Sequence, residues 1–77
     1  MKEFIEFIAK HLVDIPEDVG VEEKLSEDRN FILTLRVKKE DAGKVIGKKG
    51  RTALAMRTLL TAIAAKDGKR ATLEVLD

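Results

Sequence analysis

The sequence predicts an α+β fold in which three helices pack on one face of a three-stranded mixed sheet. Hydrophobic periodicity indicates six elements in the order helix, strand, strand, helix, helix, strand. The chain has 77 residues and no cysteine, so we expect one small domain, residues 1–77, with a core made only of packed helices and strands. Because crossovers between parallel strands are right-handed, the last strand is expected to lie parallel beside the second, with the first strand at the other edge.

The first half of the chain predicts a helix followed by a hairpin. Apolar residues recur at three- and four-residue spacing from Lys2 to about Ile15, as in an amphipathic helix, and Pro16 ends it. Residues 19–25 predict a short strand. After a polar turn, residues 31–37 carry apolar side chains at alternate positions, which predicts a strong strand paired antiparallel with the first.

The second half predicts two helices and a closing strand. A short helix fits Lys39 to about Ile46. A longer helix fits about Arg51 to Ala65, and residues 71–76 alternate as a strand. Ten of the fifteen residues in the longer helix are apolar, which is more than one buried stripe requires. We therefore expect this helix to present a second surface to a ligand or to another copy of the chain.

Charge is distributed unevenly along the chain. The formal net charge is +1, but residues 1–30 carry four basic and nine acidic side chains, whereas residues 31–77 carry eleven basic and five acidic ones. Most of the excess lies in residues 36–57, where eight basic side chains accompany two acidic ones, a net charge of +6. Such a stretch is typical of a surface that contacts nucleic-acid phosphates, although a solvated charged face is the commoner reason for a run of charges.

Gly47 and Gly50 bracket two lysines where one predicted helix passes to the next. Glycine lacks a Cβ, so the backbone there can adopt left-handed torsions and a ligand strand can approach closely. The following helix would begin with free backbone N–H groups and the positive end of its dipole, to which Lys48, Lys49 and Arg51 add charge. Phosphate is the ligand that such a site suits. The alternative is a glycine cap and a tight turn with two solvated lysines.

The segment Val45-Ile46-Gly47-Lys48-Lys49-Gly50-Arg51 resembles the Ile-Gly-x-x-Gly signature of the K homology (KH) domain, whose loop between two helices clamps about four nucleotides. A helix and two strands precede the helix pair and one strand follows it. Essentially the whole chain is therefore similar to a KH domain of the type II arrangement, α-β-β-α-α-β. In a chain of this size, the run from Gly43 to Thr52 resembles the KhpA family of small bacterial RNA-binding proteins. The resemblance implies single-stranded RNA as the ligand and a post-transcriptional or RNA-chaperone role.

The resemblance also implies roles for individual residues around the loop. Gly47 through Gly50 would receive the sugar-phosphate backbone of the RNA. Val45 and Ile46 before the loop, and Ala53 and Leu54 after it, would form an apolar wall on which bases lie. Val45 and Ile46 are equally suited to an ordinary helix core, and we expect at least one of them to belong to it.

Further contacts and partners follow from the same resemblance. The strand at residues 31–37 is expected on the far side of the groove. Besides the loop lysines and Arg51, the candidate contacts to the RNA backbone are Arg36, Lys38, Lys44 and Arg57. Members of the family are expected to self-associate or to pair with another KH-containing RNA-binding protein, so a homodimer or heterodimer through the helix at 51–65 is the alternative function that the apolar surface suggests.

We do not expect an enzyme. A nucleotide-binding P-loop needs four residues before its Gly-Lys-Ser/Thr, but only three separate Gly43 from Gly47. His11 and Ser26 are the only residues of their types and lack the partners of a catalytic triad or a metal site, so no metal or cofactor is expected. No apolar run is long enough to cross a bilayer and the chain does not start like a secretory signal, which together predict a cytoplasmic protein without membrane contact.

Overall fold

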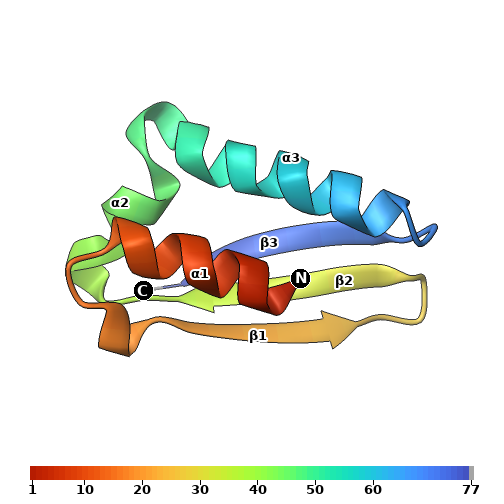
Figure 1. Cartoon of the computed structure of the whole chain (residues 1–77), viewed down its shortest axis with the longest axis horizontal. Coiled ribbons are helices and arrows are strands. Elements are labelled where there is room, and N and C mark those ends of the chain that lie inside the picture. Colours follow the sequence, from red (N-terminus) through yellow and green to blue (C-terminus); the bar gives the residue numbers. More distant parts are fainter. Residues whose placement is uncertain (77) are drawn as a thin grey trace.

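The computed structural model describes residues 1–76, and the expected elements occur in it in the expected order (Figure 1). The helices and strands are α1 (Lys2–Leu12), β1 (Gly20–Leu25), β2 (Asn30–Arg36), α2 (Ala42–Ile46), α3 (Arg51–Ala65) and β3 (Arg70–Leu76). Short 3-10 turns join them: η1 (Pro16–Asp18) before β1, η2 (Lys39–Asp41) before α2, and η3 (Lys48–Gly50) between α2 and α3. Most bounds thus agree with the sequence-based prediction to within one residue.

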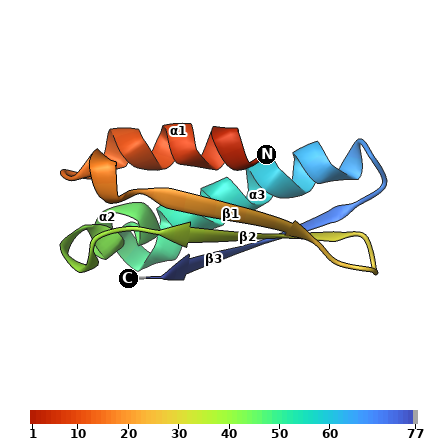
Figure 2. The same cartoon turned by 90° about the horizontal axis from the view of Figure 1, so that it is seen from below.

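The strands form a mixed sheet in the order β1-β2-β3. β1 pairs with β2 antiparallel, with Val21 opposite Leu35, and β2 pairs with β3 parallel, with Leu33 opposite Leu73. Helix α1 lies over β1 and β2, while α3 runs along β3 (Figure 1, Figure 2). The α+β class, the strand order and the packing of the helices on one face are therefore confirmed.

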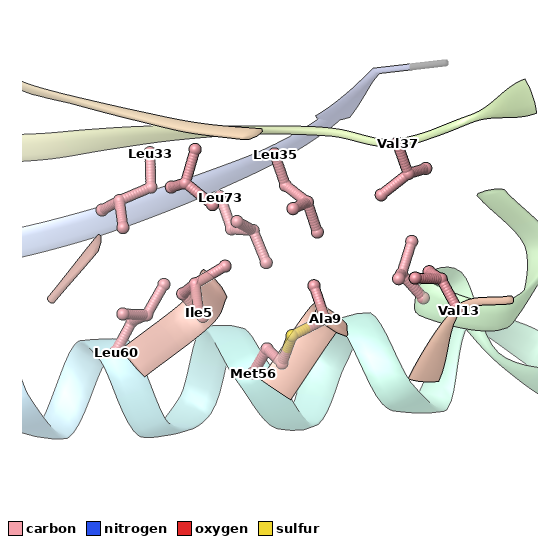
Figure 3. Packing of buried hydrophobic residues seen from close by; sticks show 11 residues of the cluster. Ile5, Ala9, Val13, Leu33, Leu35, Val37, Met56, Leu60 and Leu73 are labelled. Atoms are coloured by element: carbon pink, nitrogen blue, oxygen red, sulfur yellow. The ribbon is translucent and has the colours of Figure 1, made fainter. Parts of the chain in front are cut away.

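The core lies between the sheet and the two longer helices. Alternate residues of a strand face the same side, so Leu33 and Leu35 of β2 both point toward the helices. Figure 3 shows this layer, in which they meet Ile5 and Ala9 of α1, Met56 and Leu60 of α3, and Leu73 of β3. Each of these side chains is at most 2% exposed. The layer holds α3 on the sheet and thereby positions the segment that precedes α3.

Helix α1 is shorter than predicted, because it ends at Leu12 rather than near Ile15. Val13 turns to extended torsions (φ −96°, ψ 162°) while its side chain stays buried, so the apolar spacing continues beyond the helix. The N–H groups of Asp14 and Ile15 donate to the carboxylate of Asp41, at 3.3 Å and 3.0 Å, instead of to carbonyls of α1. A side chain distant in sequence therefore ends the helix.

The helix predicted over residues 39–46 is divided in a similar way. Its first turn is the 3-10 turn η2, and the α-helix α2 occupies only Ala42–Ile46. Asp41, at the junction, is buried by the connection that follows α1. Among residues 1–76, none of the helices is long and apolar enough to span a membrane.

Candidate nucleic-acid interface

The glycine loop, Gly47–Gly50, joins α2 to α3 at one end of the molecule, beyond the sheet (Figure 1). Its backbone has positive φ at Gly47 (79°), Lys49 (59°) and Gly50 (72°). The N–H of Gly50 donates to the carbonyl of Gly47 at 3.0 Å, which closes a tight turn. Left-handed torsions at a lysine cost about 1–2 kcal/mol, and no feature of the sequence indicates them at Lys49.

The two glycines are needed for different reasons. Gly47 has φ 79° and ψ 171°, a region that is open essentially only to glycine. A Cβ at Gly47 would lie 2.6 Å from Cβ and 2.9 Å from the backbone nitrogen of Thr52, because Thr52 packs against the loop. Gly50 has left-handed helical torsions, and a Cβ there would meet nothing within 4 Å. The surface at the start of α3 is therefore open at Gly50 and filled at Gly47.

Backbone donors suited to an anion lie within the loop. The N–H groups of Gly50 and Arg51 donate to the carbonyls of Gly47 and Lys48, so these two of the donors at the start of α3 are not free. Within residues 1–76, the N–H groups of Lys48 and Lys49 have no acceptor. Successive N–H groups in a turn that passes from right-handed to left-handed torsions form a concave anion site. The loop itself thus offers two backbone donors just before α3.

Within residues 1–76, the cations at the glycine loop form no ion pair, whereas two other cations of the basic segment do. Lys48, Lys49 and Arg51 are exposed. In the described part of the chain, ion pairs of the segment 36–57 are formed by Lys38 with Asp18 and by Lys44 with Asp14 and Asp41. The other six cations of the segment form no ion pair there: three lie together at the glycine loop and the start of α3, and the remaining three are Arg36, Lys39 and Arg57.

Lys44 belongs to a network around a buried carboxylate. Asp41 is 1% exposed and accepts hydrogen bonds from the N–H groups of Asp14 and Ile15 and from the ammonium of Lys44, the last at 3.3 Å. Burial raises the pKa of Asp41, but these hydrogen bonds outweigh it and hold the pKa below the ordinary value. Hydrogen bonds to Asp14 and Asp41 raise the pKa of Lys44. Lys44, a predicted RNA contact, therefore already has two carboxylate partners.

The predicted apolar wall divides into core and surface residues. Val45 is completely buried and Ala53 is 4% exposed, so both belong to the core and cannot touch a base in this conformation. Ile46 and Leu54 are 41% and 60% exposed. Only Ile46 and Leu54 of the four thus provide apolar surface next to the glycine loop.

The strand that runs beside α3, and that could form the far side of a groove, is β3 and not the predicted strand at 31–37. That strand, β2, lies in the middle of the sheet, whereas β3 is an edge strand that runs along α3. The Nε of Arg57 donates to the carbonyl of Leu73 in β3 at 3.4 Å. With the period of an α-helix, Arg57 shares one side of α3, the groove flank, with Leu54, Thr58 and Thr61. The groove flank therefore faces the free edge of β3.

Sequence reasoning missed two residues that shape this site. Thr52 fills the space over Gly47, and Asp41 fixes α2 to the connection after α1. From its place at the start of a predicted helix, Asp41 would be expected only to interact favourably with the helix dipole. No local signal could have found its role, because its partners Asp14 and Ile15 lie 27 and 26 residues away.

Within residues 1–76 there is no enclosed pocket and no group of side chains arranged to hold a metal ion. The surface described above is an open one, formed by a loop, a helix flank and a strand edge. Such a surface suits an extended chain better than a small molecule.

The α-β-β-α-α-β order, with a Gly-x-x-Gly loop between the two adjacent helices, defines a KH domain of the type II arrangement. The model of the KH domain of KhpA/KhpB matches residues 2–75. The chain therefore belongs to the KhpA/KhpB family of KH domains.

Relatives match over all or nearly all of their length. The chain is 54% identical to the "RNA-binding protein KhpA" of Clostridium perfringens over 76 residues, which cover 99% of this chain and 100% of the relative. It is 50% identical to the protein of the same name from Clostridium acetobutylicum, with the same coverage, and 46% identical to that of Chlamydia trachomatis over 100% of this chain and 97% of the relative. These names describe RNA binding and no catalysis.

Proposed function

We propose that this chain binds single-stranded RNA and that the glycine loop, Gly47–Gly50, holds the sugar-phosphate backbone. The observation that supports this most is the combination of free N–H groups and unpaired ammonium groups at Lys48 and Lys49 in a KH domain. Phosphate oxygens accept hydrogen bonds from both kinds of donor, and Arg51 adds a third positive charge at the N-terminus of α3. The names of the relatives support RNA as the ligand.

The bases would then lie along the groove flank of α3. Ile46 and Leu54 offer exposed apolar surface on either side of the loop, on which base rings can rest. The edge of β3 lies opposite and offers backbone hydrogen-bonding groups. The three aromatic residues, Phe4, Phe7 and Phe31, lie on α1 and β2, so this groove works without aromatic stacking and a single domain should bind with modest affinity.

Salt dependence tests the backbone clamp. Contact of three cations with phosphates predicts a slope of about −2 for log K against log salt, because single strands contribute about −0.7 for each phosphate contact. We expect the affinity for a mixed-sequence single strand to fall about 15-fold between about 50 mM and about 200 mM salt. An affinity that does not change with salt would exclude the clamp, and no binding at low salt would exclude RNA as the ligand.

Self-association is a second candidate function, supported by the side of α3 that faces away from the groove. The outer flank of α3, defined as Ala55, Leu59, Ala62 and Ile63, is exposed, with Leu59 47% and Ile63 38% exposed. Exposed leucine and isoleucine one turn apart favour burial against an apolar partner. A second copy of the chain, or another KH-containing RNA-binding protein, is the partner that we expect. The post-transcriptional role and the cytoplasmic location remain predictions.

Light scattering at high micromolar concentration tests this second function. The wild-type protein is expected to show twice the mass of one chain, and Leu59→Glu to show the mass of one. Leu54→Glu, on the groove flank, is the matched control and should leave the mass unchanged. A wild-type protein with the mass of a single chain would exclude self-association through α3.

A further inference from the structure

Arg57 occupies a distinctive place between α3 and the sheet. It lies on the groove flank, seven residues after Gly50 and therefore about 10 Å along the helix axis from the glycine loop. Its side chain is exposed, and its Nε donates to the carbonyl of Leu73. Within residues 1–76, this is the hydrogen bond that its guanidinium forms, so both terminal amino groups have no acceptor there.

The carbonyl that holds Arg57 belongs to the free edge of the sheet. Arg70 donates its N–H to Arg29, and Leu76 accepts from Val37, so residues 70, 72, 74 and 76 face β2. In a parallel strand the residues between them point their N–H and C=O groups the other way. Ala71, Leu73 and Val75 therefore present backbone groups at the free edge, and Arg57 covers one of them.

We propose that Arg57 reads the identity of one base in the groove, preferring a base that presents two adjacent hydrogen-bond acceptors. This inference rests on the proposed function, because it assumes that single-stranded RNA occupies the groove. With Nε held by Leu73, the guanidinium can offer its two terminal amino groups side by side. Two parallel N–H donors match O2 and N3 of cytosine, or O6 and N7 of guanine.

Uracil and adenine lack this pattern. In uracil the N3 position is a donor that lies between two acceptors. In adenine N1 and N7 each lie beside the donating amino group, and N3 is a single acceptor with no second acceptor next to it. A base with the wrong pattern would leave N–H groups of Arg57 unsatisfied or face them with another donor. The fork of Arg57 thus favours cytosine and guanine over uracil and adenine.

The surroundings of Arg57 suit a base better than a phosphate. The carbonyl oxygens at the edge of β3 would repel a phosphate, but they can accept hydrogen bonds from the amino groups of a base. Leu54 lies three residues earlier on the same flank and is 60% exposed, so its side chain lies next to Arg57 and can support the ring of the same base. Phosphate donors, by contrast, are concentrated at the glycine loop.

Octanucleotides of cytidine and uridine test the inference, since they are about twice the run that a KH loop clamps and carry rings of equal size. The wild-type protein is expected to bind the cytidine strand about tenfold more tightly, as one bidentate contact predicts. A single guanine in the uridine strand should likewise bind more tightly than a single adenine. Arg57→Lys keeps the charge but removes the pair of parallel donors. The ratios of affinity, cytidine to uridine and guanine to adenine, should therefore both fall to about one, through weaker binding of cytosine and guanine.

Arg70→Lys is the matched control. Arg70 lies on β3 but pairs with Asp28 in the hairpin turn, so this substitution should leave affinity and preference unchanged. Equal binding of cytidine and uridine, with guanine and adenine also equal, overturns the proposal and leaves RNA binding intact. Two results with Arg57→Lys would also overturn the proposal. One is an equal loss of affinity for all strands, which is what the loss of a phosphate contact would cause; the other is a variant that keeps both base preferences. Absence of binding to every strand removes the proposed function and this inference together.

Discussion

Helix α2 is only five residues long, and the segments at its two ends use charge in opposite ways. At its start, Asp41 is buried and surrounded by the N–H groups of Asp14 and Ile15 and by the ammonium of Lys44. At its end, Lys48 and Lys49 of the glycine loop are exposed, and within residues 1–76 they have neither a carboxylate partner nor an acceptor for their backbone N–H groups. At the start of α2 the charged groups have their partners within the protein, while at its end hydrogen-bond donors remain available to a ligand.

This difference shows that a count of charged residues does not measure the charge available for binding. The segment 36–57 has a net charge of +6, but Lys38 and Lys44 are paired with acidic residues from the first half of the chain. Part of the contrast in sign between the two halves is thus neutralised by folding. Of the six cations of this segment that form no ion pair within residues 1–76, three lie together at the glycine loop and the start of α3, where they can attract phosphate.

The largest expected effect comes from reversing the charge of the glycine loop, at the end of α2. Lys48→Asp combined with Lys49→Asp changes the charge by four units beside the phosphates. At about 1 kcal/mol per unit charge about 4 Å from a phosphate in water, this predicts a loss of about 1,000-fold in RNA affinity. Aspartate tolerates left-handed torsions, so stability should change by about 0.5 kcal/mol or less. Fluorescence anisotropy and thermal melting measure the two effects.

Lys24→Glu combined with Lys66→Glu is the matched control for this variant. Both lysines are exposed, and the charge change has the same sign and the same size. Lys66 follows the C-terminal end of α3, at the opposite end of that helix from the loop. A control that lost as much affinity as the loop variant would mean that net charge, and not the glycine loop, determines binding.

The second largest effect is expected from substitution of Gly47, the loop position at which only glycine fits. Gly47→Ala should destabilise the protein by about 3 kcal/mol, because the torsions of Gly47 exclude a side chain and the new Cβ meets Thr52. Gly50→Ala should cost only about 1 kcal/mol, since its torsions are left-handed helical and its surroundings are open. Chemical denaturation of both variants checks the order, and equal losses would contradict the difference between the two positions.

The fold could be predicted because its signals are local. Alternating apolar residues in the strand at 31–37, the apolar period of the helices and the glycines between α2 and α3 each act over a few residues. The end of α1 could not be predicted, because it depends on Asp41, whose partners lie 26 and 27 residues away. Periodicity could not reveal this end, since Val13 stays buried after the helix has stopped.

The third effect concerns Asp41, at the start of α2. The folded-state pKa of Asp41 is depressed, so its carboxylate contributes stability above its unfolded pKa, near pH 4, and this contribution is lost as the pH falls further. Asp41→Asn replaces one acceptor by a donor and should lower the melting temperature at pH 7 by roughly 5–10 °C. Melting temperatures between about pH 2 and pH 6 should depend less on pH in the variant. Parallel curves for the two proteins would show that Asp41 does not determine the acid sensitivity.

The candidate site was only partly predictable. The loop residues follow from the Gly-x-x-Gly spacing, which is a local pattern. Which apolar neighbours reach the surface depends on packing: Val45 and Ile46 are adjacent in the sequence, yet one is fully buried and the other is 41% exposed. The strand across the groove depends on which strand lies at the sheet edge next to α3, and the helix–strand contact through Arg57 joins residues 16 positions apart.

The smallest expected effect gives the most direct comparison of the two ends of α2, because the same substitution is made at a lysine of each end. Lys44→Gln removes an ammonium that two carboxylates already compensate, so RNA affinity should change by less than about twofold, while stability falls as Asp41 loses a donor. Lys48→Gln removes an ammonium that forms no ion pair within residues 1–76, so RNA affinity should fall about fivefold, equivalent to about 1 kcal/mol, with stability unchanged. Measurements at physiological salt keep the comparison local, since charges more than about 8 Å apart are largely screened there. If Lys44→Gln weakened RNA binding as much as Lys48→Gln, the Lys44 ammonium would have to leave Asp14 and Asp41 for a phosphate, and the start of α2 would be part of the binding surface after all.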